Sequence, residues 1–169
     1  MMLFTLLAVI AAPVMALSGQ ATTTRYYDGQ EGACGCGTSS SSAFSWQLGG
    51  SGFYTAAGSQ ALFGDGTWCG SGCGKCYQLT STGSAPSGQG TGGDAGQSIT
   101  VMVTNLCPNQ GNAQWCPNVG GTNQYGFEYH FDIMAQSEVF GDNPIVNFEE
   151  VTCPGAASSD FGQCQCASM

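Results

Sequence analysis

Residues 127–134 read Phe-Glu-Tyr-His-Phe-Asp-Ile-Met, and this stretch is the clearest indication of the fold class. Apolar and polar side chains alternate, so Phe131 and Ile133 share one face of an extended strand. His130 and Asp132 share the other face. A carboxyl group at such a position either lines a cleft or is buried with a partner. The stretch therefore predicts a β-strand that carries a candidate functional face.

Short apolar segments of the same kind recur at residues 22–28, 76–80, 97–105 and 145–152. The 27 glycines gather between these segments, as expected of turns and loops. Helical patterns are brief, and we expect short helices only at residues 55–63 and 135–140. Short strands separated by turns are typical of an all-β barrel or sandwich.

The N-terminus is typical of a secretory signal peptide. Residues 3–14 form an apolar run that is too short for a membrane span of ~20 residues. Val14-Met15-Ala16 resembles a small-residue cleavage site, although no Lys or Arg precedes the run. We therefore expect residues 1–16 to be a signal peptide and residues 17–169 to be a single secreted, extracellular domain with no membrane segment.

The cysteines indicate the same oxidising compartment. An even number in a small exported chain predicts a disulfide framework, whose pairing the sequence does not reveal. Because a ring closed within Cys-x-Cys is strained, we expect neighbouring cysteines to bond to distant partners. The spacing of Cys69, Cys73 and Cys76 also admits a zinc site, but disulfides suit an exported chain better. The ten are Cys34, Cys36, Cys69, Cys73, Cys76, Cys107, Cys116, Cys153, Cys164 and Cys166.

Charge is sparse and mostly negative. Two basic residues stand against eleven acidic ones, which gives a formal net charge of −9. Binding to phosphates requires several Lys or Arg, so nucleic acid and anionic membrane surfaces are excluded as partners. Only 8% of the residues are charged. Such a surface is compatible with an uncharged, hydroxyl-rich ligand such as a sugar polymer.

Two acidic residues stand out as candidates for chemistry. Asp132 lies on the polar face of its strand, and Asp28 follows Tyr26 and Tyr27 at the end of another. Hydrolysis of a glycosidic bond needs two carboxyl groups, one to protonate the leaving oxygen and one to activate water or attack the sugar. Each residue also has a structural alternative. Asp132 could bind backbone N–H groups, and Asp28 could begin an Asp-Gly turn.

Other residues are weaker candidates. His130 is the only histidine, so it forms neither a metal cluster nor an ordinary triad, and we expect it to orient Asp132 or bind substrate. Trp46 follows a polar run and is a candidate sugar platform. Trp68 and Trp115 each precede a cysteine and are expected to pack on disulfides.

Six segments together resemble glycoside hydrolase family 45, the small endoglucanases. They span nearly the whole chain from about residue 22 to residue 166. The Gly-Ala-Cys-Gly-Cys-Gly block and the Gln-Cys-Gln-Cys ending resemble the branch found in molluscs. The segments are residues 23–29, 32–37, 68–76, 103–109, 126–132 and 161–166.

The resemblance implies a six-stranded double-psi β-barrel with short helices and long disulfide-bonded loops. It implies a monomeric, secreted endo-1,4-β-glucanase (cellulase) that inverts the anomeric carbon and needs no metal or cofactor. The partner is a β-1,4-glucan such as cellulose, and residues 17–169 are the catalytic domain.

The resemblance also implies roles for particular residues. Asp28 matches the general base and Asp132 the general acid. Asn112 matches an assisting asparagine of the mollusc-like branch, with Asn105 as the second choice. The fungal branch carries an aspartate seven residues before the acid, where this chain has Tyr125. The residues expected to bind substrate are Thr24, Tyr26, Trp46, Asn105 and His130.

Two alternatives remain. Non-catalytic expansin- or barwin-like proteins that bind cell-wall polysaccharides share a similar barrel and a His-Phe-Asp segment. Expansin-like chains lack the aspartate that this chain has at Asp28. The second alternative is a disulfide-rich defence or inhibitor protein, which would bind no glucan.

Overall fold

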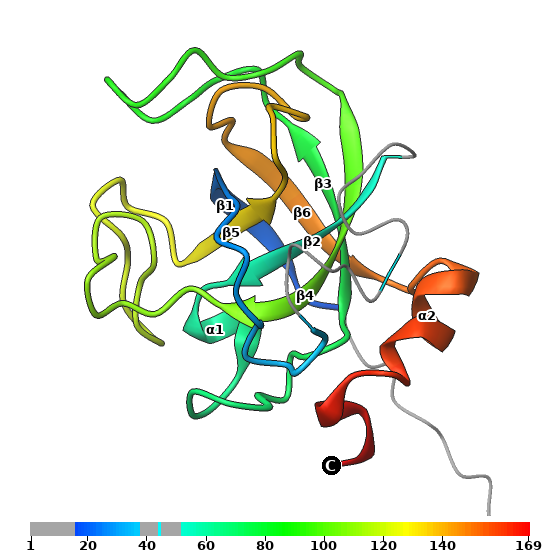
Figure 1. Ribbon diagram of the computed structural model, residues 1–169. Coiled ribbons are helices and arrows are strands. Elements are labelled where there is room, and N and C mark those ends of the chain that lie inside the picture. Colours follow the sequence, from blue (N-terminus) through cyan, green and yellow to red (C-terminus); the bar gives the residue numbers. More distant parts are fainter. Residues whose placement is uncertain (1–15, 38–43, 45–51) are drawn as a thin grey trace, which may run out of the picture.

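The computed structural model of the protein describes residues 16–37, 44 and 52–169, and Figure 1 shows their arrangement. Six strands close into a barrel in the order β1-β5-β2-β4-β3-β6. Among the described residues, no helix has the length and apolar character needed to cross a bilayer. The strands are β1 (Ser18–Tyr26), β2 (Phe53–Gly58), β3 (Cys76–Ser81), β4 (Ser98–Leu106), β5 (Tyr129–Met134) and β6 (Val146–Val151).

The barrel combines two parallel strand pairs with antiparallel ones. β1 runs parallel to β5, and β2 runs parallel to β4, while the other neighbours are antiparallel. Alternate side chains of β5 point inward, and Phe131 packs against Tyr77 and Phe148 with ring centroids 5.3 and 5.4 Å apart. His130 and Asp132 lie on the opposite face of β5, as the alternation predicts. The predicted barrel is therefore confirmed.

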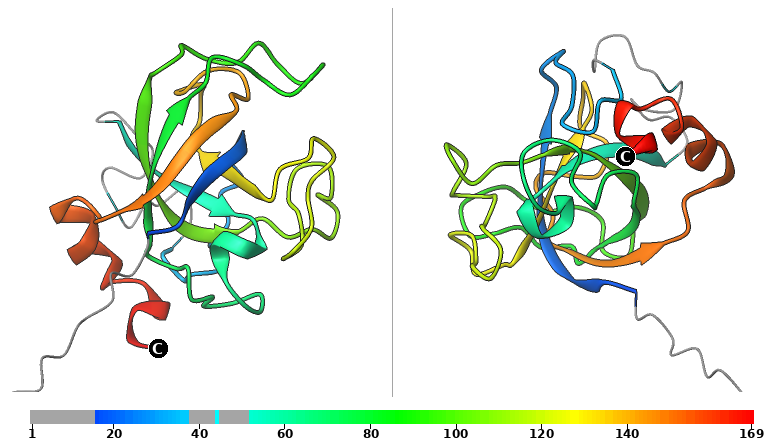
Figure 2. Two further views of the ribbon diagram at one scale, coloured as in Figure 1. Left: turned by 180° about the vertical axis from the view of Figure 1, so that it is seen from behind. Right: turned by 90° about the horizontal axis from the view of Figure 1, so that it is seen from below.

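The helices are short and lie outside the barrel (Figures 1 and 2). They are α1 (Gln60–Phe63), α2 (Gly155–Phe161) and the 3-10 helix η1 (Gln165–Ser168). The sequence did not indicate α2. Of the two predicted helices, the one at residues 55–63 is confirmed only at Gln60–Phe63, and the one at residues 135–140 is wrong.

The segment expected to be a helix at residues 55–63 is divided, because residues 55–58 belong to β2 and only Gln60–Phe63 form the helix α1. All six residues of β2 are buried. A strand buried on both faces shows no alternation, so its pattern cannot be told from that of a buried helix. Residues 135–140 are not helical either, because the N–H of Ala135 donates to the carbonyl of Tyr26 and continues the contact with β1.

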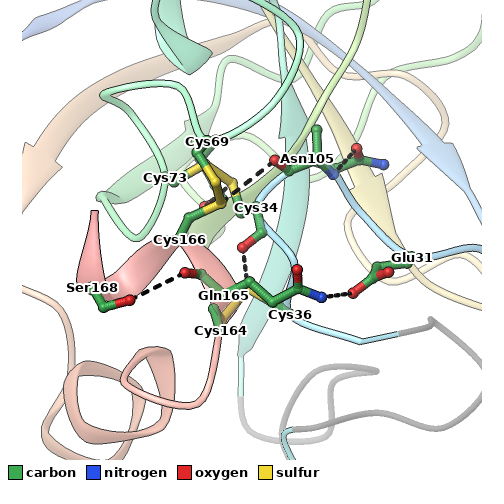
Figure 3. Close-up of a disulfide and its surroundings, with 12 residues drawn as sticks. Glu31, Cys34, Cys36, Cys69, Cys73, Asn105, Cys164, Gln165, Cys166 and Ser168 are labelled. Atoms are coloured by element: carbon green, nitrogen blue, oxygen red, sulfur yellow. Dashed lines mark hydrogen bonds between the residues drawn. A yellow bond between two sulfur atoms is a disulfide. The ribbon is translucent and has the colours of Figure 1, made fainter.

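All ten cysteines form disulfides, and the zinc alternative is wrong because Cys69, Cys73 and Cys76 bond to three different partners. Both Cys-x-Cys pairs bond to distant cysteines, as predicted. Figure 3 shows three of the bridges close together, where they join the segment after β1, the loop before β3 and the C-terminal segment. The pairs are Cys34–Cys73, Cys36–Cys164, Cys69–Cys166, Cys76–Cys153 and Cys107–Cys116.

The segment after β1 is also packed tightly onto the end of β4. A Cβ atom on Gly32 would lie 2.6 Å from the carbonyl oxygen of Thr104, so only glycine fits this approach. The N–H of Ala33 donates to Asn105 Oδ1 at 2.7 Å, and the N–H of Cys34 donates to the carbonyl of Thr104 at 3.1 Å. The disulfides and these contacts together fix the segment that begins with Asp28.

Candidate active site

Asp132 lies on the outer face of β5, beside Thr24 of the parallel strand β1. Its carboxyl group is half-buried, and Thr24 Oγ1 donates a hydrogen bond to Oδ1 at 2.7 Å. Burial raises the pKa of Asp132 to about 6, and the negative charge of Asp28 also raises it. The Thr24 hydrogen bond and the charge of Arg25 oppose this rise. Asp132 can therefore hold its proton at mildly acidic pH.

Asp28 lies two residues beyond the end of β1 and is exposed. Its Oδ1 accepts a hydrogen bond from the N–H of Gln30 at 2.9 Å, so the predicted turn is present. The carboxylate is close enough to raise the pKa of both Asp132 and Tyr26. The structure therefore brings together the two carboxyl groups singled out in the sequence, one half-buried and one exposed.

His130 is fully buried behind Asp132, so it does not reach a bound substrate. Its Nδ1 lies 2.8 Å from Thr22 Oγ1, and its Nε2 lies 2.9 Å from Thr24 Oγ1. Burial lowers the pKa of His130 to about 3, so the imidazole is neutral. The prediction that His130 orients Asp132 fits this placement, whereas direct substrate binding does not.

The hydrogen bonds around His130 have one consistent direction. Because Thr24 donates its hydroxyl proton to Asp132, its oxygen must accept from His130 Nε2–H. A neutral imidazole has one donor and one acceptor nitrogen, so Nδ1 accepts from the hydroxyl of Thr22. The Thr22 oxygen accepts in turn from Asn123 Nδ2 at 2.8 Å. Each bond thus fixes the next, and the chain ends at Asp132.

An open cavity of about 500 Å³ lies in front of Asp132, and we call it the Asp132 cavity. Beyond the β1 and β5 residues, its wall comes from three loops, which contribute Gln89, Gln114, Trp115 and Asn143. Gln114 Nε2 donates to Gln89 Oε1 at 3.0 Å, and Asn143 Nδ2 donates to the carbonyl of Gln89 at 2.6 Å. Sequence reasoning missed these amides, because nothing local shows that the three loops meet.

Tyr26 and Asn105 lie near the carboxyl pair. Asn105 Nδ2 is 3.3 Å from the hydroxyl of Tyr26, and burial together with the two aspartates raises the pKa of that hydroxyl. In the strand register, Asp132 pairs with Ala57, and Ala57 pairs with Asn105. Asn105 is thus two strands from Asp132, about 10 Å at the usual strand spacing.

Asn112 is placed differently from Asn105. It is exposed in a turn, where its carbonyl accepts from the N–H groups of Trp115 and Cys116. Among the described residues, the lining of the Asp132 cavity does not include it. Trp46 lies outside the described residues.

The other two tryptophans differ from each other. Trp115 is half-buried, packs near the Cys107–Cys116 disulfide as expected, and also lines the Asp132 cavity. Trp68 is 47% exposed, so the expectation that it packs in the core is wrong. Its neighbour Cys69 is drawn to the C-terminal segment by a disulfide, which leaves the indole at the surface.

One group of potential metal ligands lies near the site. His130 is close to the sulfur atoms of Cys107 and Cys116. These two sulfurs are bonded to each other, and both nitrogens of His130 are hydrogen-bonded to threonines. The group is therefore not available to coordinate a metal ion.

The chain is similar to proteins named as endoglucanases. It is 76% identical over 154 residues to Endoglucanase-5 of Hypocrea jecorina, covering 89% of this chain but 63% of that relative. It is 43% identical over 166 residues to Endoglucanase of Mytilus edulis, covering 87% of this chain and 90% of the relative. The sequence thus resembles the mussel enzyme, as predicted, but it is more similar to the enzyme of Hypocrea jecorina.

Solved structures and a family model give the same result. The GH45 endoglucanase EG27II in complex with cellobiose has 40% identity and a TM-score of 0.77, with 90% of each chain covered. Cel45A, the β-1,4-D-endoglucanase of the blue mussel Mytilus edulis, has 38% identity and a TM-score of 0.75, with 89% of this chain and 92% of that chain covered. A family model described as EXPB1-like domain 1 matches residues 21–168. The chain therefore belongs to the EXPB1-like domain 1 family and to glycoside hydrolase family 45.

Proposed function

We propose that this protein is a secreted endo-1,4-β-glucanase that cuts internal bonds of cellulose and related glucans with inversion at the anomeric carbon. One observation carries the proposal: a half-buried aspartic acid with a pKa of about 6 faces an open cavity beside an exposed aspartate. This is the pairing of a proton donor with a second carboxyl group that glycoside hydrolysis requires. The relatives named as endoglucanases support it.

Asp132 acts as the general acid. Because Thr24 donates to Oδ1, the proton of the neutral acid is carried by Oδ2. Oδ2 gives this proton to the glycosidic oxygen as the bond to the anomeric carbon breaks. The buried chain from Asn123 through His130 keeps the Thr24 hydroxyl pointing at Asp132, so the acid does not have to reorient during the reaction.

Asp28 acts as the general base. It is exposed, and it takes a proton from a water molecule on the face of the sugar opposite Asp132. The water oxygen attacks the anomeric carbon, which inverts. Inverting enzymes hold their two carboxyl groups roughly 6.5–9.5 Å apart to leave room for this water.

Asn105 is the better candidate for an assisting residue. It lies across Ala57 from Asp132 and contacts Tyr26, whereas Asn112 is exposed in a turn. Its Oδ1 holds the N–H groups of Ala33 and Leu106, so it positions the segment that carries Asp28.

The proposal is tested by following carboxymethyl cellulose during digestion. An internal cut lowers viscosity quickly while few reducing ends appear, and NMR of fresh products from a soluble oligosaccharide should show the α-anomer first. Retention of the β-anomer would overturn inversion. Slow loss of viscosity relative to reducing ends would overturn internal cutting.

The alternative is non-hydrolytic binding to wall polysaccharide. The chain is 38% identical over 92 residues to Putative expansin-A30 of Oryza sativa subsp. japonica, and this match covers 50% of the chain. The presence of Asp28 beside Asp132 favours hydrolysis. Folded protein that binds glucans but releases no reducing ends would establish the alternative.

Replacing Thr24 with Val should move the alkaline limb of the kcat/KM profile to higher pH. The Thr24 hydrogen bond stabilises ionised Asp132, so its loss raises the pKa above about 6. Because the acid must be protonated, wild-type activity falls as pH rises through about 6, and the variant keeps its proton longer. Thr24→Ser, which retains the hydroxyl, is the control and should keep the wild-type limb. An unchanged limb in Thr24→Val would show that Asp132 does not set it.

Residues 1–16 serve as a signal peptide in this proposal, and residues 17–169 form the secreted catalytic domain. The five disulfides are consistent with an oxidising, extracellular destination. N-terminal sequencing of the protein recovered from culture medium identifies the cleavage point.

A further inference from the structure

A second open cavity, of about 570 Å³, lies where β1 begins and β5 begins. We call it the Tyr129 cavity. Three half-buried aromatic residues line it, Tyr125, Phe127 and Tyr129, together with polar groups from Gln20 and Thr122. Partly exposed aromatic faces next to hydrogen-bonding groups suit a sugar ring, which has apolar faces and a polar edge.

The Tyr129 cavity adjoins the Asp132 cavity. Trp115 lines the Asp132 cavity, and its ring lies 4.8 Å from the ring of Tyr125, which lines the Tyr129 cavity. The side chain of Gln114 also lines the Asp132 cavity and donates to the hydroxyl of Tyr125. Asp132 and Tyr129 are three residues apart in β5, so their side chains leave opposite faces of the strand. The contacts of Tyr125 with Trp115 and Gln114 are what join the two cavities.

The aromatic segment is held in place before any ligand arrives. Asn123 is buried, and its Oδ1 accepts from the N–H groups of Tyr125 and Phe127 at 3.0 and 3.1 Å. Its backbone N–H donates to the carbonyl of Phe127, and the N–H of Gly126 donates to the carbonyl of Asn123. The same asparagine holds Thr22 and the carbonyl of Trp115. One buried side chain thus sets the geometry of both cavities, and little conformational freedom is lost when a ligand binds.

We propose that the Tyr129 cavity is a remote subsite for the glucan chain whose scissile bond lies at Asp132. This inference rests on the proposed function. Phe127 supplies the stacking face, while the ring of Tyr129 packs against Phe148 at the base of the cavity. Trp115 and Tyr125 form the wall between the two cavities. Long chains fill both cavities, and short oligosaccharides fill only the one at Asp132.

The test compares Phe127→Ala with Phe127→Tyr, which keeps the ring. We expect Phe127→Ala to lower kcat/KM for cellohexaose by about tenfold, the loss typical of truncating one aromatic side chain in a binding site. Cellotriose and cellotetraose should be cut at near wild-type rates, and Phe127→Tyr should resemble wild type on every substrate. Cleavage of reducing-end-labelled cellohexaose should shift to other bonds in Phe127→Ala, a change that a merely destabilised protein would not produce.

Two results would overturn the remote subsite while leaving the proposed function intact. One is an equal loss on all chain lengths, which would indicate a structural role for Phe127. The other is no loss on cellohexaose. Failure of the proposed function is recognised separately, because wild type would then cut no oligosaccharide of any length. Calorimetric titration of cellohexaose into Asp132→Asn protein, with and without Phe127→Ala, would then decide whether the cavity binds glucan.

Discussion

Replacing Asp132 with Asn should lower kcat/KM on carboxymethyl cellulose by about 10²–10⁴-fold, the contribution of one general acid. A sugar is a poor leaving group, and its oxygen must be protonated as the bond breaks. Asn has nearly the same shape and still offers an oxygen to the hydroxyl of Thr24, so the fold should survive. The loss therefore reports on the proton and not on the packing.

A substrate whose leaving group needs no protonation distinguishes a general acid from a residue with another role. An aryl cellobioside with a dinitrophenolate leaving group needs little protonation, so Asp132→Asn should cut it almost as fast as wild type does. Glu149→Gln removes one exposed carboxylate on β6 and is the matched control, with activity close to wild type on both substrates. An equal loss on both substrates would contradict the assignment of Asp132 as the acid. Thermal unfolding monitored by circular dichroism checks that all variants are folded.

Replacing Asp28 with Asn should lower the rate by a similar factor of about 10²–10⁴. The pattern across substrates should differ, because attack by water is needed whatever group departs. We expect Asp28→Asn to lose activity equally on carboxymethyl cellulose and on the dinitrophenyl cellobioside. The same two substrates and the same control measure it.

Activity that survives in Asp28→Asn would contradict the assignment of Asp28 as the general base. If the variant kept most of its rate and still gave the α-anomer first, another group would have to activate the water. Asn105 would then be the first residue to replace, because it lies in the strand row that contains Asp132. The double variant Asp28→Asn with Asn105→Ala would measure its share.

Much of the barrel could be predicted, because its short apolar segments are separated by turns, and buried and exposed residues alternate along the first half of β6. β2 could not, since its burial on both sides hides the period on which the prediction depends. The carboxyl pair could be singled out because the two aspartates occupy unusual local positions. Gln89, Gln114 and Asn143 could not, because their place in the site depends on contacts between distant loops.

The burial of His130 follows from tertiary structure in the same way. Its strand pattern places it on the face of Asp132, which suggests contact with a ligand. The loop that precedes β5 contributes Trp115, whose ring lies 5.6 Å from that of His130. The face of β5 is therefore divided between a covered histidine and an accessible carboxyl group. No local sequence feature indicates which residues on this face of β5 are buried and which are accessible.

The closure of the barrel determines when activity can first exist. β1 is the first strand of the barrel along the chain, yet its partners are β5 and β6, and Cys36 joins Cys164 across 128 residues. Long-range pairing of this kind makes folding slow. Closing a large loop costs conformational entropy before the contacts that stabilise the closed form can be made. Thr24 and Asp132 come from opposite sides of that closure. In a growing chain, Thr24 and Asp132 therefore stay apart, and the hydrogen bond between them forms only when the barrel closes.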